Sequence, residues 1–262
     1  MKVNSMVRKR RTSSINEAGF RTSIAETGMC LRESVLPATL VATLKEEIEQ
    51  AIEKEVQYHG TKEYQDYGMV LVCAKYGREL LKVFQNEEVM GPFDSILGDK
   101  CIAYSNTSTS MPPHTSNYSE RIHVDSPVEY PNSYLLRLSA LILLDDFTEE
   151  NGATWYLPNS QNMVQRPSEK QFVRGSKRLI APAGSIFYWN PRIWHRGGKN
   201  SSSDWRHAFT IVMCRNFMKQ RLDLPSLLED VAGIEKLSVS AKRRLGFYSV
   251  PPSSYDEYYS AE

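Results

Sequence analysis

Residues Leu135–Leu144 read LLRLSALILL, the most apolar stretch of the chain. An apolar run of this length favours a buried β-strand, and it is far too short to cross a bilayer as a helix. Short apolar or alternating segments recur on both sides of it, separated by turn residues. Together the segments are Cys101–Ser105, Ile122–Asp125, Tyr134–Leu144, Thr154–Leu157, Arg178–Ala181, Ser185–Trp189 and His207–Cys214. Many short strands at this spacing, without helices between them, predict an antiparallel sandwich or barrel.

Helical patterns lie on either side of this strand-rich region. From Pro37 to about Tyr58, apolar residues recur at three- and four-residue steps, and Gly60 follows as a stop signal. A second, shorter helix is predicted from Arg78 to about Glu88, and two more near the C-terminus at Ser226–Val231 and Ser238–Leu245. We therefore expect one domain, in which a helical layer packs on a β-barrel core.

The composition excludes several classes of protein. The chain has 262 residues, of which 41% are hydrophobic, and 32 Lys and Arg stand against 31 Asp and Glu. This length suits one large domain or two small ones, and the chain is too apolar and too weakly charged for general disorder. The near-zero net charge argues against a nucleic-acid partner bound through a broad basic face. No segment suits a membrane span or an export signal, so we expect no membrane partner.

The cysteines bear on the compartment. The four of them, Cys30, Cys73, Cys101 and Cys214, lie far apart without a CxxC pair, which indicates neither a zinc site nor a disulfide framework. Reduced thiols in a cytoplasmic protein are the simplest interpretation. The basic cluster Arg8–Arg11 is compatible with a nuclear or polyanion-binding signal, although a solvated tail is favoured.

The tripeptide His123-Val124-Asp125 is the first group that points to chemistry. In a strand, residues two apart point to the same face, so His123 and Asp125 would project together into the barrel. One imidazole and one carboxylate supply two-thirds of the 2-His-1-carboxylate site that binds Fe(II) in non-haem oxygenases. Alone, the tripeptide fits a half-buried strand with a satisfied polar pair equally well.

The second group is Trp194-His195-Arg196-Gly197-Gly198, and Arg206 lies eleven residues beyond His195. An arginine inside a barrel is costly unless it meets an anion, because its charge cannot be shed. A dicarboxylate ligand would supply that anion through a bidentate contact. Strand alternation places Arg206 and the neighbouring His207 on opposite faces. A surface ion pair between Arg206 and Asp204 is the competing interpretation.

These residues and their order resemble the phytanoyl-CoA dioxygenase (PhyH) family. The matching elements are His123-x-Asp125, Asn151-Gly152-Ala153-Thr154, Leu157-Pro158-Asn159-Ser160, His195 and Arg206. The resemblance runs from about Leu31 to Val250. The chain departs from the family at Asn159-Ser160-Gln161, where members often carry Gly-Ser-His, and at Gly197, where some members place a serine that contacts 2-oxoglutarate.

The resemblance implies a fold and an activity. The fold is a double-stranded β-helix, a jelly-roll or cupin-like barrel, with N-terminal helices packed on it. The activity is that of an Fe(II)- and 2-oxoglutarate-dependent dioxygenase, with His123, Asp125 and His195 as the catalytic iron ligands and Arg206 on the C5 carboxylate of 2-oxoglutarate. With O2 as the other co-substrate, the enzyme would release succinate and CO2 while it oxidises a C–H bond of a small metabolite or natural-product intermediate, usually by hydroxylation.

Further residues are candidates for binding the co-substrate or the substrate. Arg137, inside an otherwise apolar strand, is expected to bind 2-oxoglutarate or an acidic substrate, or else to snorkel at a strand edge. Thr154 would contact the co-substrate or build the turn, and the loop Thr107–Glu120 is a candidate lid. Four aromatic residues line a pocket or belong to the core: Trp155, Tyr188, Trp189 and Trp194.

The resemblance also sets the expected domain organisation. Residues 1–30 would form a partly mobile N-terminal tail, 31–250 a single PhyH-like dioxygenase domain and 251–262 a C-terminal tail, in a monomer or homodimer with a small-molecule substrate. Two other functions remain open. One is a non-catalytic metal- or ligand-binding barrel, and the other is a metal hydrolase that uses the same ligands.

Overall fold

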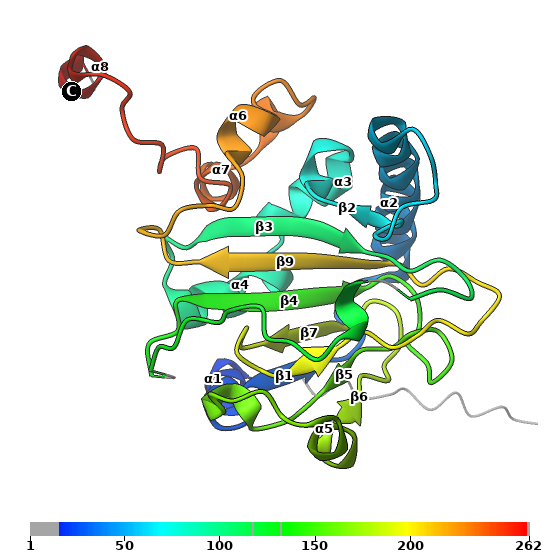
Figure 1. Ribbon diagram of the computed structural model, residues 1–262. Helices are drawn as coiled ribbons and strands as arrows, with labels where there is room; N and C mark the ends of the chain where they lie inside the picture. Colours follow the sequence, from blue (N-terminus) through cyan, green and yellow to red (C-terminus); the bar gives the residue numbers. More distant parts are fainter. Residues whose placement is uncertain (1–15, 117, 132, 261–262) are drawn as a thin grey trace, which may run out of the picture.

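The computed structural model describes residues 16–116, 118–131 and 133–260. Its largest element is an antiparallel sheet of six strands in the order β1-β7-β4-β9-β3-β2, seen nearly face-on in Figure 1. The strands are β1 (Met29–Arg32), β2 (Met69–Val70), β3 (Ile102–Thr109), β4 (Arg137–Leu143), β7 (Ile186–Trp189) and β9 (Ala208–Cys214). Strands that are distant in the sequence therefore lie side by side.

A smaller sheet of three strands completes the barrel. It contains β5 (Trp155–Tyr156), β6 (Lys177–Arg178) and β8 (His195–Arg196), in the order β6-β5-β8. Residues of both sheets line one shared cavity, with Leu141 and Thr210 coming from the large sheet and Tyr156 and His195 from the small one. The two sheets form the double-stranded β-helix that we predicted.

Strand β4 explains why its sequence is apolar almost throughout. Leu138, Ala140 and Ile142 face the helices and belong to the main hydrophobic core. Leu141 and Leu143 point to the other side, into a second cluster inside the barrel. Because both faces of the strand are covered, alternation between polar and apolar residues is lost.

Helices cover the outer face of the large sheet. They are α1 (Glu17–Thr27), α2 (Ala38–His59), α3 (Arg78–Lys82) and α4 (Glu87–Leu97). Helix α2 follows Pro37 and ends at Gly60, whose φ of 70° lies in the left-handed region, so this predicted helix is confirmed. Its buried face, with Leu44 and Ile48, packs into the same core as the outward side chains of β4 and β9.

The remaining helices are short. They are η1 (Cys73–Lys75), η2 (Val83–Gln85), η3 (Tyr118–Glu120), η4 (Ser160–Asn162), α5 (Glu169–Gly175), α6 (Leu224–Leu228), η5 (Ile234–Lys236), α7 (Val239–Arg244) and α8 (Tyr255–Ser260). Helices α6 and α7 correspond to the two helices predicted near the C-terminus. Helix α8 lies apart from the body of the molecule in Figure 1.

The single helix predicted from Arg78 to Glu88 is wrong. The chain forms α3, the short helix η2 and then α4, because Asn86 adopts an extended conformation. The Asn86 side chain accepts a hydrogen bond from the Glu88 backbone N–H at 3.0 Å, which begins the new helix. Helix α4 continues to Leu97 and places Phe93 in the core.

Two other expectations need correction. Ile122–Asp125 is not a strand, and only the backbone of His123 forms an isolated bridge, with His195. Each of the other six predicted segments overlaps a strand, although Arg178–Ala181 shares only Arg178 with β6. The tail predicted to extend to residue 30 is also wrong, because α1 buries Phe20 and Ile24 in the core and β1 pairs along β7.

No helix within the described ranges is long and apolar enough to span a membrane. The basic cluster Arg8–Arg11 lies outside the residues that the structure describes. That residues 31–250 form a single domain followed by a C-terminal tail at 251–262 stays a prediction.

Candidate active site

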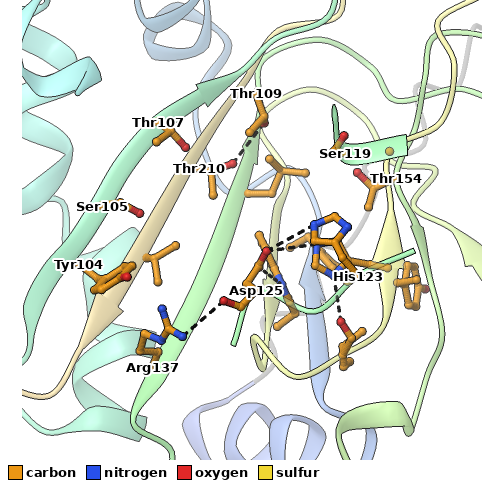
Figure 2. Close-up of a pocket in the computed structure, with 18 of the residues that line it drawn as sticks. Tyr104, Ser105, Thr107, Thr109, Ser119, His123, Asp125, Arg137, Thr154 and Thr210 are labelled. Carbon is orange, nitrogen blue, oxygen red and sulfur yellow. Dashed lines mark hydrogen bonds and ion pairs between the residues drawn. The ribbon is translucent and has the colours of Figure 1, made fainter. Parts of the chain in front are cut away.

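His123, Asp125 and His195 come together inside the mouth of the barrel. Nε2 of His123 lies 3.7 Å from Oδ1 of Asp125, and Nε2 of His195 lies 3.6 Å from the same oxygen. Each residue offers one ligand atom, and all three atoms lie within 4.8 Å of one another (Figure 2). Three donors this close can share one metal ion.

Backbone hydrogen bonds hold the three residues in place. The N–H of His123 donates to the carbonyl of His195 at 3.0 Å, and the N–H of His195 donates back to the carbonyl of His123 at 2.9 Å. The N–H of Asp125 donates to the carbonyl of Pro191 at 2.8 Å. His123 and Asp125 thus share a side although the segment is no strand, because main-chain hydrogen bonds hold both residues.

The hydrogen bonds of the side chains prepare the site for a metal. Nδ1 of His123 lies 2.8 Å from the carbonyl of Arg121, and Nδ1 of His195 lies 2.9 Å from the carbonyl of Ile193. Since a carbonyl only accepts, each Nδ1 is assigned the proton, which leaves the lone pair on Nε2. Trp189 donates its indole N–H to Oδ2 of Asp125 at 3.2 Å, so Oδ1 faces the imidazoles.

The shifted pKa of His123 also favours metal binding. Burial, and after it the neighbouring His195, lower the pKa of His123, although Asp125 opposes the shift. A lowered pKa keeps the imidazole neutral around neutral pH, which is the form that binds a metal. Two imidazoles and one carboxylate, each held by a further hydrogen bond, fit the donor set of a non-haem Fe(II) site.

The site opens into a cavity of about 360 Å³ between the two sheets. Its polar wall comes from β3 and β9, where Thr109 and Thr210 are joined through their hydroxyl groups at 3.2 Å. Its apolar wall includes Leu141, Phe187 and Ile193. The cavity therefore offers a ligand both apolar contacts and hydroxyl groups beside the metal ligands.

Arg206 lies in the wall of this cavity and is 3% exposed. One guanidinium nitrogen donates to the carbonyl of Thr109 at 3.2 Å, the guanidinium lies 4.6 Å from the ring centre of Phe147, and Nε has no hydrogen-bond partner. Burial lowers the pKa of Arg206 to about 10. The alternative of a surface ion pair with Asp204 is wrong, because the Arg206 side chain points inward.

The other two candidates for the co-substrate lie at different places in the cavity. Thr154 is half-buried and lies on the side of His123, close to Ser119 (Figure 2). Arg137 lies beside Tyr104, away from Thr109 at the Arg206 end. The structure thus brings Thr154 to the metal ligands and separates Arg137 from Arg206.

Several residues of the cavity were missed by the sequence analysis. They are Tyr104, Ser105, Thr109, Ser119 and Thr210. The alternation of hydroxyl residues along β3 was the available signal, since Ser105, Thr107 and Thr109 all line the cavity. Ser119 had no signal, because its place beside Gly197 depends on the path of a loop.

Ser119 bears on the departure from the family at Gly197. The Gly197 N–H donates to the Ser119 carbonyl at 2.7 Å, and a Cβ added at Gly197 would overlap the Ser119 hydroxyl oxygen. Both residues line the cavity. The space that a serine at position 197 would use is thus taken by the hydroxyl group of Ser119.

Of the four aromatic candidates, one lines the cavity and three pack elsewhere. Trp189 lines the cavity, whereas Tyr188 packs edge-on against Phe20 and Phe93 in the main core. Trp155 stacks on Arg178, and Trp194 joins a small cluster with Ile122 and Phe172.

Three histidines lie outside the metal cluster. His59 stacks on Tyr64 with ring centres 3.8 Å apart, and His114 is an exposed loop residue with a positive φ. His207 faces outward, where its Nδ1 lies 2.8 Å from Asp145. None of the three lines the cavity that holds the metal ligands.

Comparisons with known proteins bear on the family of the chain. The model of the family described as Phytanoyl-CoA dioxygenase (PhyH) matches residues 24–208. The uncharacterized protein Rv1501 of Mycobacterium tuberculosis (strain ATCC 25618 / H37Rv) is 25% identical over 240 residues, which cover 88% of this chain and 87% of that protein. The dioxygenase ALT11 of Alternaria alternata is 30% identical over 134 residues, which cover 47% of this chain and 42% of that protein.

Solved structures share the fold. AviO1 from Streptomyces viridochromogenes Tue57 superposes with a TM-score of 0.63 at 18% identity, covering 79% of this chain and 99% of that one. SnoK, a non-haem alpha-ketoglutarate-dependent carbocyclase from nogalamycin biosynthesis, gives a TM-score of 0.60 at 19% identity, covering 83% and 89%. At these identities the likeness concerns the fold.

Proposed function

The chain belongs to the phytanoyl-CoA dioxygenase (PhyH) family, and from this premise we propose that it is an Fe(II)- and 2-oxoglutarate-dependent dioxygenase. Its reaction is the oxidation of a C–H bond in a small metabolite or natural-product intermediate, with release of succinate and CO2. One observation carries the proposal. His123, Asp125 and His195 converge at a cavity whose wall also contains the buried guanidinium of Arg206.

The metal ligands and their supports have separate roles. His123, Asp125 and His195 hold the metal, and the bound iron supplies the activation of O2 that is coupled to decarboxylation of 2-oxoglutarate. The carbonyls behind the two imidazoles keep both Nε2 atoms unprotonated. Trp189 keeps one carboxylate oxygen of Asp125 engaged, so that the other faces the metal.

Arg206 binds the distal carboxylate of the co-substrate. A buried guanidinium with an unpartnered Nε has donors to spare, and a carboxylate satisfies two of them at once. The hydroxyl groups of Thr109 and Thr210 lie nearby and add neutral donors. Thr154, on the metal side of the cavity, is placed to contact the end of the co-substrate that reaches the metal.

The test is a binding and turnover experiment. Protein stripped of metal is titrated with Fe(II) without oxygen, 2-oxoglutarate binding is measured by calorimetry, and succinate is measured after air is admitted. We expect tight 2-oxoglutarate binding only with metal, and succinate formation that is abolished in His123→Ala and Asp125→Ala. His114→Ala, an exposed histidine outside the cavity, is the matched control and keeps both properties.

The same experiment separates the competing functions. A wild-type protein that binds neither iron nor 2-oxoglutarate and forms no succinate would contradict the proposal. A metal hydrolase would work with Zn(II) and ignore 2-oxoglutarate. A non-catalytic barrel would bind its ligands and form no succinate.

A further inference from the structure

The cavity contains a second buried arginine that the co-substrate does not explain. Arg137 is the first residue of β4 and is 9% exposed. Its guanidinium lies 4.6 Å from the ring centre of Tyr104, and one nitrogen donates to the carbonyl of Asp125 at 3.4 Å, a long hydrogen bond. Its Nε has no partner, and the side chain has no ion pair with any carboxylate of the described residues.

Such a group is costly to bury without an anion. Arg244 shows the usual solution in this same chain, because it is 2% exposed and pairs with Glu87 at 2.9 Å and Asp94 at 2.6 Å. Arg137 has no such partner, although its charge persists at any physiological pH. Its donors face a cavity instead, so a ligand in that cavity is the available source of negative charge.

2-Oxoglutarate at Arg206 cannot be that ligand. In the pairing of β4 with β9, Arg137 lies opposite Cys214, whereas Arg206 precedes the other end of β9. The seven residues of β9 that lie between these ends span about 20 Å. The carboxylate held by Arg206 therefore cannot also reach Arg137, and the other carboxylate of the diacid would be engaged by the metal, so the donors of Arg137 are left for a second anion.

The cavity adjoins an outer depression through Arg221, near the Arg137 end. Arg221 is exposed there and lines both the cavity and an outer depression next to Glu55 and Glu120. The backbone N–H of Arg221 donates to the carbonyl of Tyr104 at 3.0 Å, so Arg221 lies next to the residue whose ring contacts the guanidinium of Arg137. Arg221 is exposed to solvent, which weakens its contacts with charged groups, so the buried Arg137 is the group expected to select for charge.

We propose that Arg137 binds an anionic group of the substrate, a carboxylate or a comparable oxyanion, so that the enzyme acts on small organic acids. This inference rests on the proposed function, since it takes Arg206 to hold the co-substrate. The anion of the substrate lies on the donors of Arg137 that the ring of Tyr104 does not cover, and the rest of the substrate extends past Asp125 towards the metal. Arg137 thereby fixes which C–H bond faces the metal.

The test compares organic acids with their neutral amides. Wild-type protein saturated with Zn(II), which does not react with O2, and with 2-oxoglutarate is titrated by calorimetry. The probes are hexanoate against hexanamide and 3-phenylpropanoate against 3-phenylpropanamide. We expect at least one acid to bind tenfold or more tightly than its amide. Arg137→Gln removes the charge-assisted contact and is expected to reduce the ratio of acid to amide affinity below about twofold. Arg137→Lys only weakens that contact and is expected to keep part of the preference for the acid.

Controls separate this inference from the proposed function. Arg206→Met removes 2-oxoglutarate binding and keeps the preference for the acid. If wild-type protein binds no 2-oxoglutarate but prefers acids through Arg137, the proposed function fails and the anion site stands. Should Arg137→Gln not fold, a crystal structure of the wild-type complex with the acid must place its carboxylate within hydrogen-bonding distance of Arg137. Equal binding of acids and amides by the wild type, or a preference that survives in Arg137→Gln, overturns the inference.

Discussion

The indole N–H of Trp189 donates to Oδ2 of Asp125 at 3.2 Å and so decides which carboxylate oxygen faces the two imidazoles. Without this bond the carboxylate can rotate, and either oxygen can turn away from the metal. The contact joins the end of strand β7 to a segment that has no regular structure of its own. The orientation of one metal ligand thus depends on a residue that does not touch the metal.

Trp189→Phe should therefore weaken metal binding by about tenfold or more, because the partner that orients a ligand is removed while the ligand remains. The measurement is a competition titration of Zn(II) against a chromophoric chelator. Trp155→Phe is the matched control, because Trp155 belongs to the neighbouring small sheet and does not line the cavity. Equal zinc affinity in Trp189→Phe and wild type would show that the bond has no part in orienting Asp125.

Arg206→Met should abolish co-substrate binding without weakening the fold. We expect the dissociation constant of 2-oxoglutarate to rise at least about 100-fold, since a charge-assisted contact to a carboxylate is lost. The melting temperature without ligand should stay the same or rise, because a buried charge without a carboxylate partner is removed. Calorimetry and thermal unfolding measure the two effects.

The pKa of about 10 adds a dependence on pH to this prediction. The guanidinium is charged below that value, so 2-oxoglutarate affinity in the wild type should hold through pH 9 and fall above about pH 10. The control is Arg178→Met, which removes an arginine that stacks on Trp155 outside the cavity and should leave the affinity unchanged. An Arg206→Met variant that still binds 2-oxoglutarate normally would assign the carboxylate to another group.

Gly197→Ser should destabilise the folded protein, and it should do so less when the Ser119 side chain is shortened. The added side chain overlaps the Ser119 hydroxyl group, and we expect a loss of about 1–3 kcal/mol in the free energy of unfolding. In a Ser119→Ala background the loss should shrink by at least about 0.5 kcal/mol. Urea denaturation of the four variants of this cycle gives the coupling.

Gly91→Ser is the control for that cycle, because nothing lies within 4 Å of a Cβ added there. Its effect on stability should be the same in both backgrounds. Additive effects of Gly197→Ser and Ser119→Ala would mean that the loop carrying Ser119 moves aside at no cost.

Asp145→Asn should cost about 1–2 kcal/mol of stability at neutral pH, after allowance for solvent screening of a partly exposed group. Burial raises the pKa of Asp145, but hydrogen bonds from His207 and Lys45 outweigh it and lower the pKa to about 2. Because the folded value lies below the unfolded one, the contribution is fully present above about pH 4 and disappears as the pH falls towards 2.

Urea denaturation of Asp145→Asn and wild type between pH 3 and pH 7 measures this effect. The difference between the two proteins should be constant from pH 5 to pH 7 and shrink below pH 4. Asp204→Asn changes an exposed carboxylate that lines the same surface depression as Asp145, and it should show almost no difference. A difference that persists undiminished at pH 3 would contradict the assignment to the charge of Asp145.

The jelly-roll strands were largely predictable because their burial leaves a pattern in the sequence. β4, β7 and β9 are buried on both faces and fall inside predicted segments. β1 was missed because it is short and follows a helix, and its place is set by pairing with β7. The break between α3 and α4 depends on one capping side chain, Asn86, inside an otherwise helical pattern.

The metal ligands were predictable because few residues can bind iron and their order is informative. The separation of Arg137 from Arg206 was not, since it depends on the register between β4 and β9, which no local pattern specifies. Ser119 and Trp189 acquire their roles from contacts between segments distant in the sequence. A role that follows from the residue type can be predicted from the sequence. A role that depends on which residues lie close together can be recognised only once the fold is known.

The paired backbone hydrogen bonds between His123 and His195 have a consequence for how the protein acquires its metal. The two residues lie about seventy positions apart, and bringing them together has a cost in chain entropy that folding has already met. Because the fold brings these two ligands together, the binding free energy of the ion is not needed to close the chain between them and is available as affinity.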